Sequence, residues 1–383
     1  MKNSIFALIL LFFANTLLAQ KSEYLKEEVV NCHYRTNSID VNKDNTKLLI
    51  GGENKMVMVY DLVKKKNVFE MEAHYQPVVE VQFSNKHDGF YTVGDKSFKL
   101  WINGEEKAEK LFTGSHTSIT DWAMTPAEDY FVGGSHEKKF RYWNASTLTT
   151  PQSITTSQTK SVISVAISDN HKLIACGSLD KTIELYKTDS LTQTRRIIAH
   201  AGPISCLEFV NHDKNLISAS HDGYAKLWNV NTGKNIKVYS GHTKPVSAID
   251  ISPNGKYLLT ASYDNSINLY MISTGDLIYH YVHHETPVLD VKWNNKGDEF
   301  YSCDKEGQIA RWSVPKSLFV DFYFGADMNN DIHNNELFQP KSKGESRDAY
   351  KERQVKAEAY EQKLFDTYYQ KYLELLKTQT IAE

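Results

Sequence analysis

Cysteine is scarce in this sequence, and so is net charge: the 383 residues include four cysteines and carry a formal net charge of -3. The low charge excludes the basic excess that nucleic-acid-binding chains carry, so we expect no nucleic-acid partner. Cys176, Cys206 and Cys303 lie in apolar, strand-like segments, where a free thiol packs as a small hydrophobic side chain. We therefore expect free thiols in the core. A disulfide is the alternative, since export would permit one.

Long apolar runs are also missing beyond the N-terminus, and no later segment approaches the roughly 20 residues that cross a membrane. The N-terminus has a basic start, an apolar run from Ile5 to Ala14 and a small residue at Ala19. This order predicts a secretory signal peptide over residues 1–19; a retained membrane anchor is the alternative. No cysteine near Ala19 could carry a lipid. We expect an exported chain without a membrane span after cleavage, located in the periplasm, at the cell surface or outside the cell.

Motifs of common catalytic and cofactor sites are missing as well. The sequence has no Gly-rich dinucleotide loop after a strand, no P-loop, no HExxH and no nucleophile elbow. Its densest group of metal-binding side chain types runs from His280 to Glu285. His283 and His284 are neighbours there, and on a strand they would point to opposite faces. We expect no cofactor, no metal site and no catalytic residue.

What the sequence does contain is a repeat of about 42 residues. Seven similar strand-like segments each end in an aromatic residue: Tyr60, Trp101, Trp143, Tyr186, Trp228, Tyr270 and Trp312. A repeat of this length that ends in a Trp-bearing strand is typical of a β-propeller. Each repeat buries its apolar faces only against its neighbours, so the units must stack or close into a ring.

The fifth repeat shows the pattern best. It has apolar strands over 204–209, 216–220 and 225–228, separated by turns rich in Asn, Asp and Gly. The pattern resembles the WD40 family over about residues 33–312. The resemblance implies an all-β, seven-bladed WD40-like β-propeller, to which we add a C-terminal α-helical extension.

In that family a His, a Ser or Thr, a turn Asp and a Trp form a hydrogen-bonded set. The resemblance places this set on His200, Ser218, Asp222 and Trp228, and in the sixth repeat on His242, Thr260 and Asp264, with Tyr270 in place of Trp. A His, a Ser and an Asp also form the triad of hydrolases. Their recurrence from repeat to repeat favours a structural role. The set is incomplete elsewhere: Glu137 and Glu306 take the acidic turn position in repeats 3 and 7, and repeat 4 lacks the His.

Two segments compete to close the ring. Residues 24–30 form an N-terminal strand that would complete the last blade, as is usual in the family, and residues 317–323 follow Trp312 at the spacing of an outer strand. We favour the N-terminal strand. We therefore predict a propeller over 20–324, a polar linker over 325–345 and a C-terminal helix over 346–383, capped at Ser346.

The C-terminal helix carries an apolar and aromatic face. At helical spacing its members are Ala357, Tyr360, Leu364, Tyr368 and Leu375. This face either packs back on the propeller wall or docks a partner.

A second candidate surface comes from the family topology, which exposes the residue before each turn acid on one face of the disc. This candidate partner face consists of Tyr75, His136, Leu179, His221 and Tyr263. Aromatic side chains are favoured at the centre of binding patches. The alternative is that these are ordinary turn residues.

The sequence favours an exported, non-catalytic scaffold that binds protein partners of the cell envelope through this face and the C-terminal helix. Leu18-Ala19-Gln20 and the segment from Phe338 resemble exported proteins of Bacteroidetes-type bacteria. A second hypothesis is an envelope propeller that binds or cleaves a peptide or glycan, because Glu80, Asp121 and Asp290 occupy equivalent inner-strand positions. A third is a subunit of a larger envelope assembly.

Overall fold

The computed structural model describes residues 24–102, 107–146, 151–379 and 381. They divide into two compact units, one ending at Ser313 and the other beginning at Val314. The predicted signal peptide over residues 1–19 lies outside the described residues. No helix among the described residues is long and apolar enough to cross a membrane.

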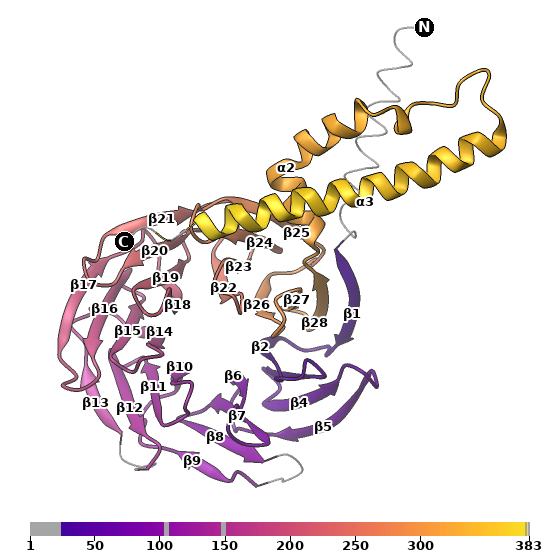
Figure 1. Cartoon of the computed structure of the whole chain (residues 1–383). Helices are drawn as coiled ribbons and strands as arrows, with labels where there is room; N and C mark the ends of the chain where they lie inside the picture. Colours follow the sequence, from indigo (N-terminus) through magenta and orange to yellow (C-terminus); the bar gives the residue numbers. More distant parts are fainter. Residues whose placement is uncertain (1–23, 103–106, 147–150, 380, 382–383) are drawn as a thin grey trace, which may run out of the picture. The chain divides into compact units, whose positions relative to one another are not determined.

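The first unit is built from seven four-stranded sheets, the blades, arranged around a central channel (Figure 1). The inner strands line the channel: β2 (Thr36–Val41), β6 (Val78–Phe83), β10 (Ile119–Met124), β14 (Val162–Ile167), β18 (Ile204–Val210), β22 (Val246–Ile251) and β26 (Val288–Trp293). The second strands follow: β3 (Lys47–Gly52), β7 (Gly89–Gly94), β11 (Tyr130–Ser135), β15 (Leu173–Ser178), β19 (Asn215–Ser220), β23 (Tyr257–Ser262) and β27 (Glu299–Asp304).

The third and outer strands complete each blade. The third strands are β4 (Met56–Asp61), β8 (Ser97–Ile102), β12 (Lys139–Asn144), β16 (Thr182–Lys187), β20 (Ala225–Asn229), β24 (Ser266–Met271) and β28 (Gln308–Ser313). The outer strands are β5 (Lys66–Glu72), β9 (Lys110–Phe112), β13 (Gln152–Thr155), β17 (Gln193–Ile198), β21 (Asn235–Tyr239), β25 (Leu277–Val282) and β1 (Leu25–Asn31). Blades 1 to 7 begin at β2, β6, β10, β14, β18, β22 and β26. The seven-bladed propeller predicted from the repeat is confirmed, and all seven repeat-ending aromatics lie in third strands.

The N-terminal strand closes the ring, as expected. β1 is the outer strand of blade 7 and pairs antiparallel with β28, with Leu25 opposite Trp312 and Asn31 opposite Gln308. Gly307 makes the turn before β28 with a positive φ of 86°, and its carbonyl accepts a 2.9 Å hydrogen bond from the Cys32 amide. A Cβ at Gly307 would lie 2.3 Å from the Tyr34 carbonyl oxygen, so this approach requires glycine.

The core of the propeller lies between blades. Leu49 and Val57 of blade 1 share one apolar cluster with Val78 and Phe90 of blade 2. Further clusters join blades 2 and 3, 3 and 4, 4 and 5, and 7 and 1. Because each blade buries its faces against its neighbours, no blade has a complete core of its own.

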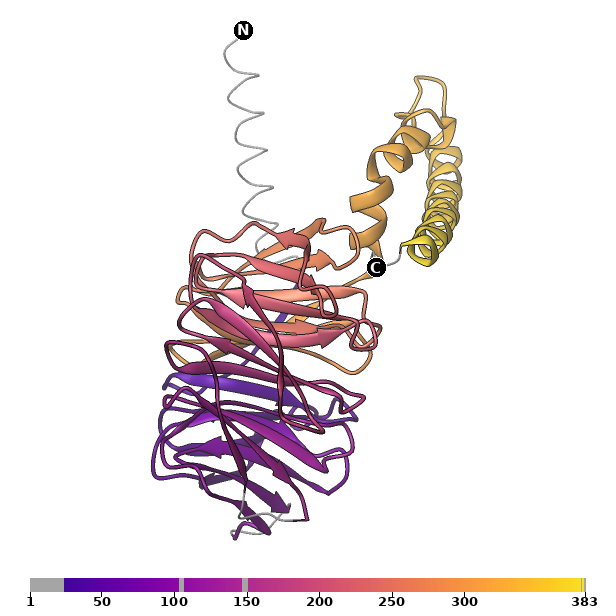
Figure 2. The ribbon, with the colours of Figure 1, turned by 90° about the vertical axis from the view of Figure 1, so that its left-hand side faces the viewer.

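The second unit contains α2 (Lys316–His333), the short 3₁₀ helix η1 (Glu336–Phe338) and α3 (Arg347–Thr378). Ser346 caps α3, as predicted, by accepting a hydrogen bond from the Ala349 amide. The predicted propeller end at residue 324 is wrong, because the first unit ends at Ser313, and α2 occupies the first part of the predicted polar linker over 325–345. Residues 317–323 are helical too, so they do not form the competing strand. Both views show α2 and α3 running alongside each other (Figures 1 and 2).

Aromatic packing between the helices explains this error. Phe319 of α2 stacks on Tyr372 of α3 with ring centroids 5.2 Å apart, and Phe324 lies 5.7 Å from Tyr368. The Asn- and Asp-rich end of α2 suggests a loop locally, but the Tyr368 hydroxyl donates a 2.8 Å hydrogen bond to Asp331 there. Tertiary contacts therefore outweigh the weak local helix propensity of this segment.

Candidate partner face and central channel

The predicted polar set of blade 5 is present, and its members hydrogen-bond one another. His200 Nε2 lies 2.8 Å from Ser218 Oγ, and Nδ1 lies 3.0 Å from Asp222 Oδ2. The Trp228 indole N–H donates to the same Ser218 oxygen at 2.8 Å. Burial lowers the pKa of His200, which favours the neutral ring that can donate to Asp222 and accept from Ser218. Since Ser218 is fully buried, this set holds the blade together and is not a hydrolytic triad.

Asp222 is the charged member of the set. Burial alone would raise its pKa, but hydrogen bonds from His200 and the Ala201 amide hold the pKa near 2. Blade 6 repeats the arrangement: His242 lies 2.6 Å from Thr260 Oγ1 and 3.0 Å from Asp264.

Sequence reasoning missed two further complete sets. In blade 2 the members are His74, Thr92, Asp95 and Trp101, and in blade 7 they are His284, Ser302, Asp304 and Trp312. Glu306 is therefore not the turn acid of blade 7. The signal for the histidines was available, because His74 and His284 lie at multiples of 42 residues from His200.

Blades 3 and 4 depart from the set in ways the sequence partly indicated. Gln158 occupies the histidine position of blade 4 and donates to the Cys176 carbonyl at 2.9 Å. In blade 3, Gly133 stands where blades 2, 5, 6 and 7 have Ser or Thr, and Trp143 donates instead to the Thr113 carbonyl at 2.8 Å. His116 of this blade is exposed.

The side chains of the candidate partner face differ in how far they are exposed to solvent. Tyr75 is 85% exposed, and His136 and His221 are also exposed. Leu179 and Tyr263 are half-buried, and Tyr263 packs against the apolar cluster between blades 7 and 1. The turns lie close to the loops of the following blade, since Ser161 Oγ donates a 3.2 Å hydrogen bond to the His136 carbonyl.

Two exposed side chains of this face were missed from the sequence. Tyr224, 43% exposed, follows the turn of blade 5, and His116 lies in the loop that leads into blade 3. Both could have been found from the sequence: Tyr224 lies two residues after a turn acid, and His116 lies at the position of the repeat histidine. The exposed members of the face therefore come from blades 2, 3 and 5.

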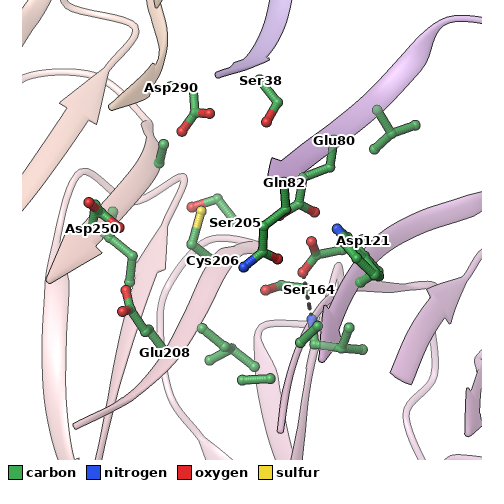
Figure 3. Close-up of a pocket in the computed structure, with 18 of the residues that line it drawn as sticks. Ser38, Glu80, Gln82, Asp121, Ser164, Ser205, Cys206, Glu208, Asp250 and Asp290 are labelled. Carbon is green, nitrogen blue, oxygen red and sulfur yellow. Dashed lines mark hydrogen bonds between the residues drawn. The ribbon is translucent and has the colours of Figure 1, made fainter. Parts of the chain in front are cut away.

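The central channel holds a cavity of about 470 Å³ lined by the inner strands (Figure 3). The predicted acidic trio lines it, and its three carboxyls have different hydrogen-bond partners. Asp290 accepts a 2.9 Å hydrogen bond from the Ile39 amide of blade 1, and Asp121 accepts a 2.7 Å bond from the Val165 amide of blade 4. Glu80 is hydrogen-bonded to Asp121.

The same arrangement recurs one level along the channel, where sequence reasoning named no residue. Asp40 accepts a 2.6 Å hydrogen bond from the Phe83 amide of blade 2, and Asp250 accepts one of the same length from the Trp293 amide of blade 7. Inner strands have no sheet partner on the channel side, so these amides would otherwise be unpaired. The channel acids Asp40, Asp121, Asp250 and Asp290 thus join consecutive blades.

Burial shapes the ionisation of these acids. It raises the pKa of Asp40 to about 6, of Asp290 to about 7 and of Glu208 to about 8. Among the described residues, no group of three or more His, Cys, Asp and Glu side chains is arranged to hold a metal ion. The four cysteines, all described, are free.

The predicted docking face of the C-terminal helix is partly occupied within its own unit. Tyr360 packs on Phe338 of η1 at 6.1 Å, and Tyr368 is buried against α2. Ala357 is buried, whereas Leu364 and Leu375 are half-buried. Neither alternative drawn from the sequence included α2 as the element that covers this face.

The repeats can be assigned to a class. Four segments, residues 149–187, 191–229, 233–270 and 275–313, match the family model "WD domain, G-beta repeat". With the geometry above, they define a seven-bladed β-propeller in which four segments match WD40 repeats. WD40 propellers act as protein-interaction scaffolds.

Among curated proteins, the chain is similar to animal and plant WD40 proteins. It is 25% identical over 200 residues to the Serine-threonine kinase receptor-associated protein of Gallus gallus, covering 51% of this chain and 55% of that protein. It is 31% identical over 137 residues to the Guanine nucleotide-binding protein subunit beta of Arabidopsis thaliana, covering 34% of this chain and 35% of that protein. The chain thus spans about half or less of these relatives. Both are eukaryotic, so the bacterial resemblance rests on its terminal segments alone.

Proposed function

We propose that this chain is an exported, non-catalytic scaffold that binds a protein partner through the candidate partner face. The observation that carries the proposal is the exposure of Tyr75, His136 and His221 on loops of one face. Tyrosine and histidine side chains present flat, amphipathic rings, and exposed aromatic rings favour binding at the centre of a contact. The polar set of blade 5, beneath the loop that carries His221, is hydrogen-bonded within the blade, so it serves as rigid support.

The similarity to the kinase receptor-associated proteins and to the G-protein β subunit supports the scaffold class. Export is supported by the signal-like pattern that ends at Ala19. The helical unit supplies a second contact: Val355 of α3 is 65% exposed. An envelope partner follows from export.

The test is affinity capture from the native cell envelope with the full chain and with a variant carrying Tyr75→Glu, His136→Glu and His221→Glu. We expect the variant to fold, because its three sites are exposed, and to lose the partner. A separate Val355→Glu variant tests whether the helical unit contributes to partner binding. Capture of every partner by the folded triple variant would remove this face from the proposal.

Export has its own measurement. Mass spectrometry of the chain from fractionated cells should find an N-terminal peptide that begins at Gln20 in the envelope or the medium. A cytosolic chain that keeps residues 1–19 would refute export and leave the scaffold proposal standing.

A further inference from the structure

Blades 2 to 4 carry unpaired lysines on the candidate partner face. Because neighbouring strands of a blade are antiparallel, the loop entering each inner strand and the turn before each third strand lie at the same end of the blade. In these three consecutive blades (Figure 1), four exposed lysines occupy such segments, and none forms an ion pair with a residue that the structure describes: Lys96, Lys138, Lys160 and Lys181.

The acids of the same loops are half-buried and have cations of the chain beside them. The pairs are Asp95 with Lys99, Glu137 with Arg141 at 2.8 Å, and Asp180 with Arg196 at 3.4 Å. Arg196 is shared with the buried Glu184, which lies 3.8 Å away. At most one of these carboxylates is therefore left without a cation of its own, against four exposed lysines.

The rest of this face has no such excess. In the corresponding loops of blades 5, 6, 7 and 1, three exposed lysines are accompanied by three exposed glutamates: Lys55, Lys244, Lys305, Glu53, Glu285 and Glu306. The unbalanced positive charge of the candidate partner face is thus confined to blades 2 to 4.

Exposed rings lie on the same three blades. Tyr75, in the loop entering blade 2, is 85% exposed, and His116 is exposed in the loop entering blade 3. His136 is exposed in the turn of blade 3, two residues before Lys138. Aromatic rings supply the centre of a protein contact, and charged side chains around them supply its polar rim.

We propose that the partner of this scaffold docks on blades 2 to 4 through an acidic segment, rich in Asp and Glu, whose carboxylates lie against the four lysines. The inference rests on the proposed function and specifies which blades make the contact and what chemistry the partner presents. Opposite charges attract over about 8 Å at physiological salt, so they orient the partner before the rings make contact. A protein segment fits better than a nucleic acid, since the whole chain has a net charge of -3.

Fluorescence anisotropy of the full chain with labelled deca-glutamate tests the charge preference, with deca-lysine as the probe of opposite sign. We expect the glutamate peptide to bind, more weakly as salt is raised, and the lysine peptide not to bind. Reversing the four lysines should weaken binding by about tenfold or more. This lysine-reversal variant carries Lys96→Glu, Lys138→Glu, Lys160→Glu and Lys181→Glu.

The matched control reverses four exposed lysines in the turns at the opposite end of the blades, so the net charge changes equally. Its substitutions are Lys43→Glu, Lys86→Glu, Lys172→Glu and Lys296→Glu. We expect the control to bind deca-glutamate within about twofold of the parent chain, because its changes lie away from the proposed contact. Equal binding by the two variants would overturn the inference, as would tighter binding of a single-stranded decanucleotide than of deca-glutamate at physiological salt.

Capture from the native envelope separates this inference from the proposed function. Loss of the partner from the lysine-reversal variant but not from its control supports an acidic partner. If the variant with Tyr75→Glu, His136→Glu and His221→Glu loses the partner while the lysine-reversal variant keeps it, the acidic partner is refuted and the scaffold proposal stands.

Discussion

Asp290 Oδ2 of the last blade accepts a 2.9 Å hydrogen bond from the backbone amide of Ile39 in the first blade. The closure of the ring is therefore supported by this bond on the channel side and by β1 on the outer side, with the apolar cluster of blades 7 and 1 between them. The four amide bonds accepted by Asp40, Asp121, Asp250 and Asp290 make carboxylates a recurring connection between inner strands.

Removing this acceptor should destabilise the propeller. Asp290→Ala leaves the Ile39 amide unpaired in a buried site, which we expect to lower the free energy of unfolding by about 1–3 kcal/mol. Asp290→Asn keeps an oxygen that can accept the bond. Urea denaturation of both variants at pH 6 should rank Asn well above Ala. Equal losses would show that the hydrogen bond contributes nothing.

The same residue predicts a pH dependence. Burial raises the pKa of Asp290 from its ordinary 3.8 to about 7, so between those values the folded chain binds more protons than the unfolded chain. The stabilisation from this group is fully present below about pH 4 and is lost as the pH rises through 7. Asp290→Asn has no such loss. Its stability relative to the parent chain should therefore increase from pH 5 to pH 8, as measured by urea midpoints at constant salt.

The buried serine of blade 5 should matter for stability and not for binding. Ser218→Ala removes the oxygen shared by His200 and Trp228, and we expect a loss of about 1–3 kcal/mol. Ser153→Ala, on the exposed outer strand β13, should change stability by less than about 0.5 kcal/mol. Partner capture by folded Ser218→Ala should match the parent chain. Loss of capture without loss of stability would assign Ser218 a direct role.

A network of ion pairs beside β1, here called the charged seam, provides a further prediction. Arg311 of β28 contacts Glu27 of β1 at 3.1 Å and Glu299 of β27 at 2.6 Å, and Lys26 also pairs with Glu299. Arg311→Ala should cost about 1–3 kcal/mol, since Glu299 is largely buried and loses a charge partner.

Arg35→Ala is its matched control, because Arg35 pairs with Glu53 at the surface, where ion pairs contribute about 0–1 kcal/mol. The melting temperatures of both variants at two salt concentrations distinguish the contribution of the Arg311 ion pairs from that of the Arg35 ion pair. Equal effects would mean that the seam network is no stronger than a surface pair.

The helical unit has its own critical side chain. Arg353 of α3 pairs with Glu345 at 2.8 Å and donates to the carbonyls of Leu337 and Gln339 at 2.9 and 2.7 Å. Arg353→Ala should release the segment between η1 and α3, so hydrogen exchange over residues 336–345 should accelerate. Arg347→Ala, exposed at the start of α3, should not change it. Unchanged exchange in Arg353→Ala would contradict this role.

The repeat made most of the propeller predictable. The positions of Trp228 and Trp312 located the third strands, and the spacing from His200 located the polar set of blade 6 but was not followed to the sets of blades 2 and 7. Glu306 was misassigned because 20 residues separate His284 from its acid, against 22 for His200 and Asp222. Helix α2 was missed because its packing partner, Tyr372, lies about fifty residues away in sequence.

The channel was predicted only in part. Glu80, Asp121 and Asp290 were found by aligning equivalent positions, but the pattern of side chains does not show that a backbone amide of the next blade will bind them. An acid on an inner strand is equally compatible with catalysis, ligand binding and a structural bond. Only the arrangement of neighbouring strands distinguishes these uses.

The pairing of Leu25 with Trp312 has a consequence for how the protein is made. A ribosome synthesises β1 first, yet its hydrogen-bonding partner appears only after nearly the whole ring has been translated. Until then β1 has no strand to pair with, and the blade translated last exposes apolar surface to water. Assembly of the ring is therefore a late event, and the nascent chain needs protection from aggregation for most of its synthesis.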